Sequence, residues 1–281
     1  MPSLPPHFFL FEAAFFMQIP AVLLFVAYAW APHRVLNFSA TACLTGSFFL
    51  HLLFTGALAY SGGRLPLASG FEFLSGWGLI LTALVVWLEW EHRLGLLGTF
   101  LAPLSAALLL MGFRFVKAAS DPVPGLDDAW LLSHVALAMV AYSCFTAAAG
   151  VAGAYLVQER QLKAKRLGTL FYQLPPLQAL EELLARLALA GLTALLAALV
   201  AGFVWKQHLY GQWGLDDPKV VFNLGVGAVF AVGLWFRRSG ALRGRRFAVL
   251  CVLTFLAVFF GFYLVNIYFG GHGFLRPATG A

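Results

Sequence analysis

The chain has 281 residues, of which 61% are hydrophobic and only 11% are charged. Soluble domains carry about 25% charged residues, so this composition excludes a soluble globular protein, and its high hydrophobicity excludes a disordered chain. The formal net charge of +6 would suit a nucleic-acid partner. Short clusters of Lys and Arg between apolar runs are, however, also what membrane orientation requires.

Eight apolar runs, each long enough to cross a bilayer, follow one another along the chain. A span needs about 20 apolar residues, and continuous runs predict helices, which satisfy their own backbone hydrogen bonds in lipid. The expected spans are Phe8–Trp30, Leu36–Tyr60, Ala68–Trp90, Leu94–Phe115, Trp130–Leu156, Leu180–Trp205, Val220–Phe236 and Phe247–Phe269. We therefore predict an all-α protein, a polytopic membrane helix bundle with eight transmembrane helices that forms a single integral membrane domain over residues 1–281.

Basic residues between the spans predict the orientation of the chain. Arg and Lys gather at residues 160–166, after the fifth span, and at residues 237–246, after the seventh. Because basic loops stay on the cytoplasmic side, we place both segments inside and, by alternation, both termini and the loop 206–219 outside. Membrane topology then explains the positive charge. We therefore expect the protein to lie in the lipid bilayer and to bind no nucleic acid.

On the cytoplasmic side, residues 174–187 combine a pair of prolines with an apolar face. Leu177, Leu180, Leu184 and Leu187 are spaced by three or four residues, which places them on one side of a helix. We expect this segment to lie in the membrane interface before the sixth span begins. The alternative is that it is simply the start of a long span.

Motifs for covalent chemistry are absent from the sequence. Cys43, Cys144 and Cys251 lie in apolar stretches and form no C-x-x-C pair, so any haem is not covalently attached to this chain. Walker A, G-x-S-x-G and H-E-x-x-H patterns are also missing. We therefore expect a protein that is not an enzyme.

Two histidines are expected on the outer side at similar depth. His134 begins the exposed end of the fifth span, and His272 follows the eighth span. Two imidazoles facing one another from separate helices can hold a metal or a haem iron axially. The alternative is that each is an interfacial residue. His51 lies well within the second span, where an ionisable group is either functional or part of a hydrogen-bonded helix contact.

The external loop 206–219 lies between these two histidines in the sequence. Asp217 is expected to cap the seventh span, with Pro218 at its first helical position. Tyr210, Trp213 and the glycines of the loop have no such explanation, and an aromatic loop can lie against a flat ligand face. External cations are candidate partners for ligand carboxylates or interfacial anchors; they are Arg64, Arg114, Lys117, Lys206 and Lys219.

Five stretches in a constant order carry a resemblance to a known family. They are 63-GRLPLASGFEFLSGWG-78, 134-HVALAMVAYSCFTAAAGVAGAYLVQERQLKAKR-166, 174-LPPLQALEELLARLALAG-191, 214-GLDDPKVVFNL-224 and 243-RGRRFAVLCVLTFLAVFFGFYLVN-266, with His272 beyond. On these stretches the chain resembles the cytochrome c assembly family of membrane haem-handling proteins, the CcsA/CcmC group. Spans one and two match this pattern less clearly.

The resemblance implies a haem site. In that family a tryptophan-rich external loop, the WWD domain, presents haem between two flanking external histidines, and His134 and His272 match those positions. It thereby implies non-covalent haem b ligated by these two histidines, with Trp213 and Tyr210 near the macrocycle. Asp217, Lys219 and Arg64 complete the expected site, and cations would meet the propionates. The expected location is the bacterial inner (plasma) membrane, with the haem site on the external face.

The chain also departs from the full family motif. Members with that motif read approximately W-x-W-D-P-K-E, whereas here Gly214 and Asp216 replace the tryptophans and Val220 replaces the glutamate. Full synthetase members carry a membrane-embedded histidine where this chain has Trp235. This pattern is similar to the HemX-like branch, which is associated with tetrapyrrole metabolism and with control of glutamyl-tRNA reductase.

Three functional hypotheses follow from the residues and the resemblance. The first is a haem-binding membrane protein that holds or passes haem at the outer face for cytochrome c assembly, working with a second cytochrome c assembly membrane protein. The second is a HemX-like regulator that acts through its basic cytoplasmic segments, residues 160–166 and 237–246, on a tetrapyrrole-synthesis enzyme. The third is a haem transporter that uses His51 within the bundle.

Overall fold

The chain folds into α-helices, described here from a computed structural model. The structure describes residues 7–67, 69–92, 96–115, 128–165, 173–211, 213–214 and 217–268, with side chains to residue 262 except those of His92 and Arg114. The helices are α1 (Phe8–Trp30), α2 (Arg34–Gly62), α3 (Gly70–His92), α4 (Leu97–Phe115), α5 (Ala129–Lys163), α7 (Leu177–Tyr210), α8 (Pro218–Arg238) and α9 (Arg245–Tyr268). Within these ranges there is no strand, which confirms the all-α prediction.

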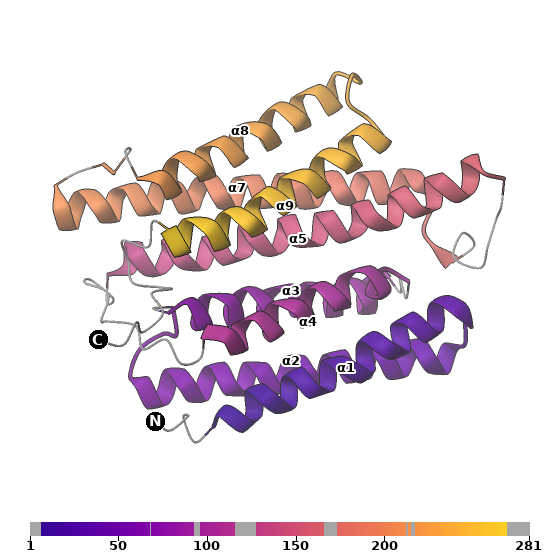
Figure 1. Cartoon of the computed structure of the whole chain (residues 1–281), viewed down its shortest axis with the longest axis horizontal. Helices are drawn as coiled ribbons and strands as arrows, with labels where there is room; N and C mark the ends of the chain where they lie inside the picture. Colours follow the sequence, from indigo (N-terminus) through magenta and orange to yellow (C-terminus); the bar gives the residue numbers. More distant parts are fainter. Residues whose placement is uncertain are drawn as a thin grey trace.

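The helices lie side by side along one long direction and alternate in sense (Figure 1). The most extensive pairing joins α5 to α7, and the next joins α1 to α2. The start of α1, the turn from α2 to α3 and the turn from α7 to α8 lie at one end of the bundle, which we call the site end. The end of α5 and the turn from α8 to α9 lie at the opposite end, which we call the basic end.

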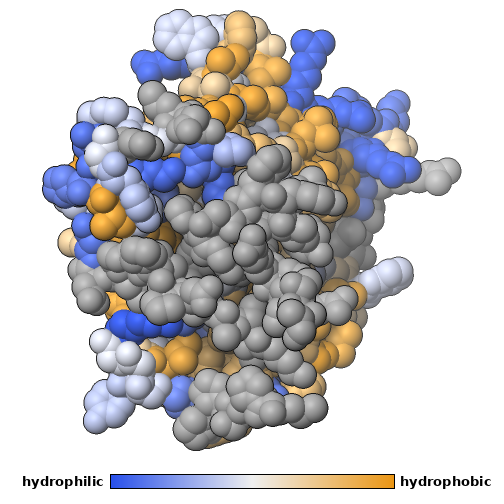
Figure 2. All heavy atoms as spheres, turned by 60° about the vertical axis from the view of Figure 1, so that its left-hand side comes forward, coloured by the Kyte–Doolittle hydropathy of each residue, from blue (hydrophilic) through white to orange (hydrophobic). Residues whose placement is uncertain are grey.

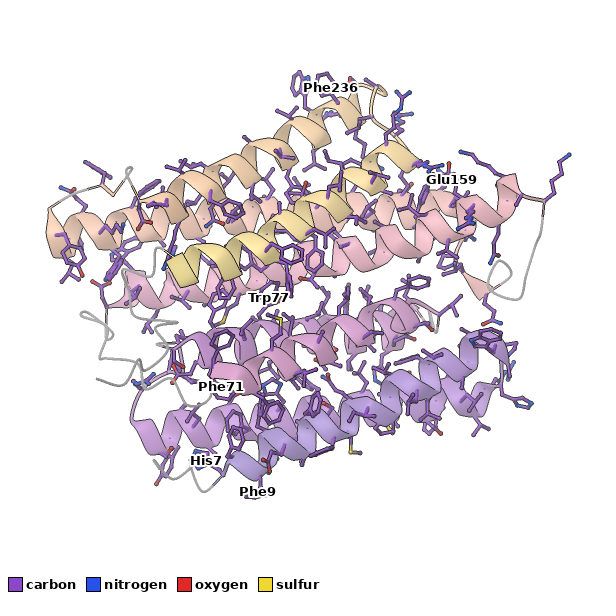
Figure 3. The ribbon with its side chains drawn as sticks, viewed as in Figure 1. His7, Phe9, Phe71, Trp77, Glu159 and Phe236 are labelled. Carbon is purple, nitrogen blue, oxygen red and sulfur yellow. The ribbon has the colours of Figure 1, made fainter. Side chains whose placement is uncertain are left out.

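Both ends can be followed in the view with side chains. His7 and Phe9 of the α1 start and Phe71 of the α3 start lie at or near the site end, whereas Glu159 and Phe236 lie towards the basic end (Figure 3). Arg238, Arg243, Arg245 and Arg246 of the α8–α9 turn are exposed. The long axis of the bundle therefore separates a cationic end from the end that holds the expected ligand loop.

Seven of these helices are long and apolar enough to cross a membrane. A chain with several such helices is a multi-pass membrane protein. The predicted first span coincides with α1, and the others agree with their helices to within a few residues at most boundaries. Two helices are longer than expected, since α5 has 35 residues and α7 has 34. The fourth predicted span corresponds to α4, a shorter apolar helix.

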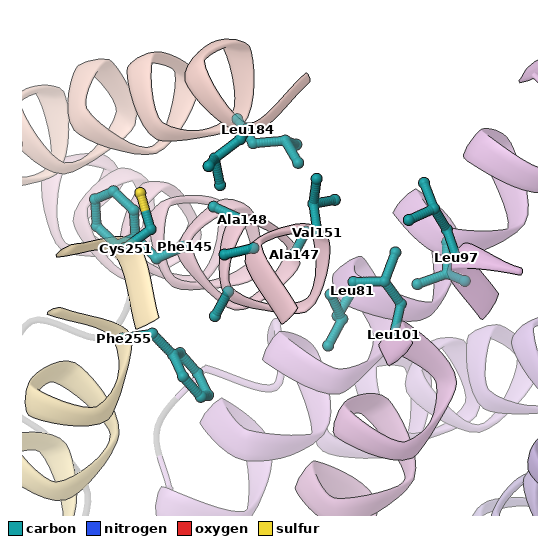
Figure 4. Packing of buried hydrophobic residues seen from close by; sticks show 14 of the residues in the cluster. Leu81, Leu97, Leu101, Phe145, Ala147, Ala148, Val151, Leu184, Cys251 and Phe255 are labelled. Atoms are coloured by element: carbon teal, nitrogen blue, oxygen red, sulfur yellow. The ribbon is translucent and has the colours of Figure 1, made fainter. Parts of the chain in front are cut away.

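Helix α7 corrects one expectation. It runs without interruption from Leu177 to Tyr210, so the segment 174–187 is no separate interfacial helix. Leu180 and Leu184 are fully buried and Leu187 is nearly so. Their apolar face packs into the protein core rather than on a lipid interface, because all three belong to one buried cluster with Ala148 of α5. Figure 4 shows Leu184 near Ala148. The segment is the start of a long span.

Local sequence signals explain where several helices begin. Before α3, Ser69 and Glu72 form a reciprocal capping box in which the Glu72 N–H donates to Ser69 Oγ (3.1 Å) and the Ser69 N–H donates to Glu72 Oε2 (3.2 Å). Asp128 caps α5, because its side chain accepts a hydrogen bond from the Trp130 N–H at 2.7 Å. The Asp128 cap sets the start of α5, the helix that carries His134.

The core surrounds α5, where small side chains allow neighbouring helices to approach closely. Figure 4 shows buried residues of α3, α4, α7 and α9, among them Leu81, Leu101, Leu184 and Cys251, meeting around Ala148 of α5. The rings of Phe145 on α5 and Phe230 on α8 stack with centroids 4.1 Å apart. A Trp77 N–H of α3 donates to Thr146 Oγ1 of α5 at 3.1 Å, so a polar contact also joins these helices.

Large apolar side chains are also exposed on the outside of the bundle. Trp30, Phe38 and Phe16 are more than half exposed. In Figure 2, which brings the site end forward, hydrophilic residues (blue) lie beside hydrophobic ones (orange). Exposed apolar area of this extent belongs in lipid, because soluble monomers rarely carry large contiguous apolar patches.

Candidate functional site

A cavity of about 180 Å³ lies at the site end, between the start of α5, the end of α7, the start of α8, α9 and the segment that leads into α3. Most of its wall is apolar, including Leu131, Phe203 and Phe222. Its charged or titratable lining residues include three that the sequence predicts for the site, His134, Asp217 and Lys219, together with Lys206. Residues from both sides of the aromatic loop are thus brought together with the first predicted histidine.

His134 lies in the second turn of α5 and is part-buried. Its Nδ1 is 2.7 Å from the backbone oxygen of Ala198 on α7. A carbonyl oxygen only accepts hydrogen bonds, so Nδ1 carries the proton and donates it to this bond. Nε2 makes no hydrogen bond with the described residues. This is the arrangement of a metal-binding imidazole, in which one nitrogen is anchored to a backbone carbonyl and the other is a free ligand.

Asp217 connects the two helices that flank the loop. Its Oδ1 accepts a hydrogen bond from the Lys219 N–H (2.9 Å), which caps α8 as the sequence predicts, with Pro218 at the first helical position. Its Oδ2 forms an ion pair with Lys206 Nζ of α7 at 2.6 Å. Burial alone would raise the pKa of Asp217, but the hydrogen bonds from Lys206 and Lys219 and both lysine charges hold that pKa below its ordinary value. The carboxylate is therefore charged at neutral pH.

Two further polar residues, Tyr142 and Asn223, line the cavity and were not predicted from the sequence. The Tyr142 hydroxyl of α5 donates to Asn223 Oδ1 of α8 at 2.8 Å. Asn223 Nδ2 in turn donates to the Lys219 backbone oxygen at 2.8 Å. The available signal was the spacing of four residues between Lys219 and Asn223, which places both on one face of α8. These bonds hold the start of α8 against α5.

Three predicted site residues lie elsewhere. Arg64 forms a bidentate ion pair with Glu72, with Nη1–Oε2 at 3.0 Å and Nη2–Oε1 at 2.9 Å, and so closes the turn between α2 and α3. Tyr210 and Trp213 are 51% and 57% exposed and do not line the cavity. The Tyr210 ring meets the ring of Trp205 edge-on, with centroids 6.0 Å apart. The cavity thus contacts the helix ends on either side of the loop rather than its aromatic residues.

The remaining candidates are only partly described. His272 and Lys117 lie outside the described residues, as does the side chain of Arg114. The pairing of His134 with His272 therefore stays a prediction. Trp235, which the resemblance matches to a membrane-embedded histidine, is 71% exposed on α8.

His51 forms a structural contact between helices. It is fully buried, its Nε2 lies 2.7 Å from Ser75 Oγ of α3, and its ring packs edge-on against Phe11 of α1. It lines neither the site cavity nor a second cavity, of about 240 Å³, that Ser75 and Glu72 line between α2, α3 and α5. The transporter hypothesis, which relies on His51, stays a prediction.

Comparisons with known proteins match the part of the chain that forms this site. A family model described as cytochrome C assembly protein matches residues 66–272, which include α3 to α9 but neither α1 nor α2. Protein HemX of Brevibacillus brevis is 27% identical over 257 residues, covering 90% of this chain and 94% of that protein. Cytochrome c biogenesis protein CcsA of Guillardia theta is 29% identical over 248 residues, covering 80% of this chain and 79% of that protein. A CcsA protein of Synechococcus sp. (strain CC9605) is 25% identical over 254 residues.

Proposed function

This chain belongs to the cytochrome c assembly protein family, and from that premise we propose that it holds or passes haem at the outer membrane face during cytochrome c assembly. It is a multi-pass membrane protein, and its relatives include proteins named HemX and proteins named CcsA. The proposed role is binding and orientation without an enzymatic step, because the iron chemistry belongs to haem itself. The partners proposed are haem and a second cytochrome c assembly membrane protein.

The proposed orientation puts the cavity outside. The positive-inside rule assigns the exposed arginines of the basic end to the cytoplasm. The site end, and with it the cavity, then faces the external side of a bacterial inner membrane. Because the helices alternate in sense (Figure 1), we propose that all eight, α4 included, cross the membrane and that both termini are external.

The observation that carries the proposal is the state of His134. Its Nε2 makes no hydrogen bond with described residues, on a ring that lines an apolar cavity and is anchored through Nδ1. Such a nitrogen suits haem iron, and the apolar wall suits a porphyrin face. Lys206 and Lys219 on the same wall would meet propionate carboxylates. The residues present therefore fit non-covalent haem b, and we propose His272 as the second iron ligand.

Spectroscopy of the purified protein tests this proposal. Titration of the detergent-solubilised chain with ferric haem is expected to produce a histidine-ligated Soret band. His134→Ala should shift that band or abolish it, because the proposed iron ligand is lost. His208→Ala is the matched control, since His208 is exposed near the end of α7 and does not line the cavity. Equal Soret bands in the wild type, His134→Ala and His208→Ala would refute haem ligation by His134.

A second candidate function is regulation of tetrapyrrole synthesis. The observation that favours it is the similarity to protein HemX along 94% of that protein, together with an aromatic loop whose Trp213 does not line the cavity. The exposed arginines of the basic end would contact a soluble tetrapyrrole-synthesis enzyme. Deleting the gene would then change the cellular amount of glutamyl-tRNA reductase while cytochrome c maturation stays normal. An unchanged amount of reductase would refute this candidate.

A further inference from the structure

One face of α7 forms the wall of the cavity opposite α5. Ala198, Gly202 and Lys206 follow one another at intervals of four residues and all line the cavity. Residues four apart lie above one another on a helix, so these three make a continuous strip. The pairing of α5 with α7, the most extensive in the bundle, places this strip against His134.

Gly202 is in direct contact with the His134 ring. A Cβ atom added at Gly202 would lie 2.7 Å from Nδ1, 2.9 Å from Cε1 and 3.3 Å from Cγ of that ring. Real Cβ atoms essentially never approach other heavy atoms within 3.0 Å, so any other side chain at this position would displace the imidazole. Glycine destabilises a helix interior relative to alanine, and the close approach of the ring is a physical reason for glycine here.

The same turn of α7 anchors the ring. The Ala198 carbonyl accepts the Nδ1–H bond at 2.7 Å, one helical turn before Gly202. The anchoring bond determines the tautomer, because a proton on Nδ1 leaves Nε2 as the unprotonated nitrogen of a neutral imidazole. It also makes the ring a stronger ligand, since a hydrogen bond from the distal nitrogen raises the basicity of the ligating one.

We propose that Gly202 and the Ala198 carbonyl are positioning groups that hold His134 as the Nδ1-protonated tautomer with Nε2 available for iron. This inference rests on the proposed role of His134 as a haem ligand. In this inference α7 orients the iron ligand that α5 carries. Helix α7 itself contributes none of the predicted iron ligands. Neither residue was among the site residues expected from the sequence.

The tautomer can be measured without haem. Nitrogen-15 NMR of the apo protein labelled at histidine distinguishes the two neutral tautomers, and the His134 signals are identified by their loss in His134→Ala. The expected result is a protonated Nδ1 and an unprotonated Nε2 at a pH where the ring is neutral. A protonated Nε2 would overturn the inference, whether or not haem binds and whether or not any Gly202 variant folds.

Haem binding supplies the second measurement. Gly202→Ala is expected to weaken ferric haem binding by about 10- to 100-fold, the usual effect of losing the partner that orients a metal ligand. The matched control is Gly225→Ala on α8, where an added Cβ has nothing within 4 Å, and it should bind like the wild type. Thermal unfolding of both apo variants shows whether each is folded.

The outcomes separate the inference from the function on which it rests. Weaker binding in both His134→Ala and Gly202→Ala, with Gly225→Ala unchanged, supports the inference. Weaker binding in His134→Ala with unchanged binding in Gly202→Ala overturns the positioning role and leaves haem ligation by His134 standing. Unchanged binding in His134→Ala overturns the proposed function and the inference together.

Discussion

At the scale of single residues, Asp217 performs two tasks. It caps α8 through the Lys219 N–H and forms an ion pair with Lys206, whose side chain lies across the loop. Gly214 makes this possible, because its φ of +63° is a left-handed conformation that favours glycine. An added Cβ there would clash with Lys206 Cδ and would lie 2.7 Å from Lys206 Nζ. The left-handed backbone at Gly214 thus leaves room for a part-buried ion pair between Lys206 and Asp217.

We expect Asp217→Asn to lower the free energy of unfolding by about 2 kcal/mol at neutral pH, because asparagine keeps the cap but removes the charge-assisted bond to Lys206. Asp128→Asn is the matched control, since Asp128 caps α5 and has no ion pair with a described residue. Denaturation with SDS in mixed micelles gives both values. Equal effects in the two variants would contradict a contribution from the ion pair.

The same pair predicts a pH dependence. The pKa of Asp217 in the folded protein lies below its ordinary value of about 3.9. A depressed carboxylate pKa contributes stability that is present above the unfolded pKa and is lost as the pH falls through the folded pKa. The difference in stability between the wild type and Asp217→Asn should therefore shrink below about pH 4. A difference that stays constant from pH 7 to pH 3 would refute this assignment.

At the scale of the elements, α5 and α7 form the central pair of the bundle, and small residues allow them to approach closely. An added Cβ at Gly191 of α7 would lie 2.5 Å from Phe145 Cε1 and 3.2 Å from Cys144 Cβ, both on α5. The Phe145 ring is itself stacked on Phe230 of α8. A displacement at Gly191 would thus reach α5, α7 and α8, all three of which line the cavity.

Gly191→Ala is accordingly expected to destabilise the protein by about 1–3 kcal/mol, the usual cost of overpacking a core. Gly56→Ala on α2 is the control, because nothing lies within 4 Å of its added Cβ and the position is exposed. Alanine favours a helix more than glycine does, so the control should be unchanged or slightly more stable in SDS titrations. A neutral Gly191→Ala would show that α5 and α7 have room to separate.

At the scale of the whole molecule, the alternation of the helices and the separation of charge predict how the protein lies in the membrane. Ser61, near the end of α2, is exposed at the site end, and Ser239, after α8, is exposed at the basic end (Figure 1). These two positions report on opposite sides of the membrane in the proposed orientation.

Cysteine labelling tests this orientation. In a background with Cys43, Cys144 and Cys251 replaced by alanine, Ser61→Cys should react with an impermeant maleimide in right-side-out vesicles. Ser239→Cys should react only after permeabilisation, because basic turns remain cytoplasmic. The reverse pattern would invert the orientation, and labelling of both from the same side would contradict the alternation of the spans.

The order and approximate limits of the helices that the structure describes could be predicted from the sequence. Continuous apolar runs, the cap at Asp217 and the clusters of Lys and Arg are local signals, and a membrane helix satisfies its backbone within its own segment. The family could also be predicted, because its motifs are ordered along the chain and the family model matches residues 66–272. Local chemistry sufficed for these properties.

Contacts between distant residues decided the rest. The Nδ1 of His134 is anchored by a carbonyl 64 positions away, and Gly202 makes room for its ring. Arg64 forms an ion pair with Glu72 instead of lining the cavity, and Leu180 and Leu184 near the start of α7 are buried in the core that surrounds α5. No periodicity within one segment specifies which helix face meets which neighbour, since packing and burial determine it only when the whole bundle assembles. The helices therefore follow from the sequence, whereas the orientation of the proposed iron ligand follows from the tertiary structure.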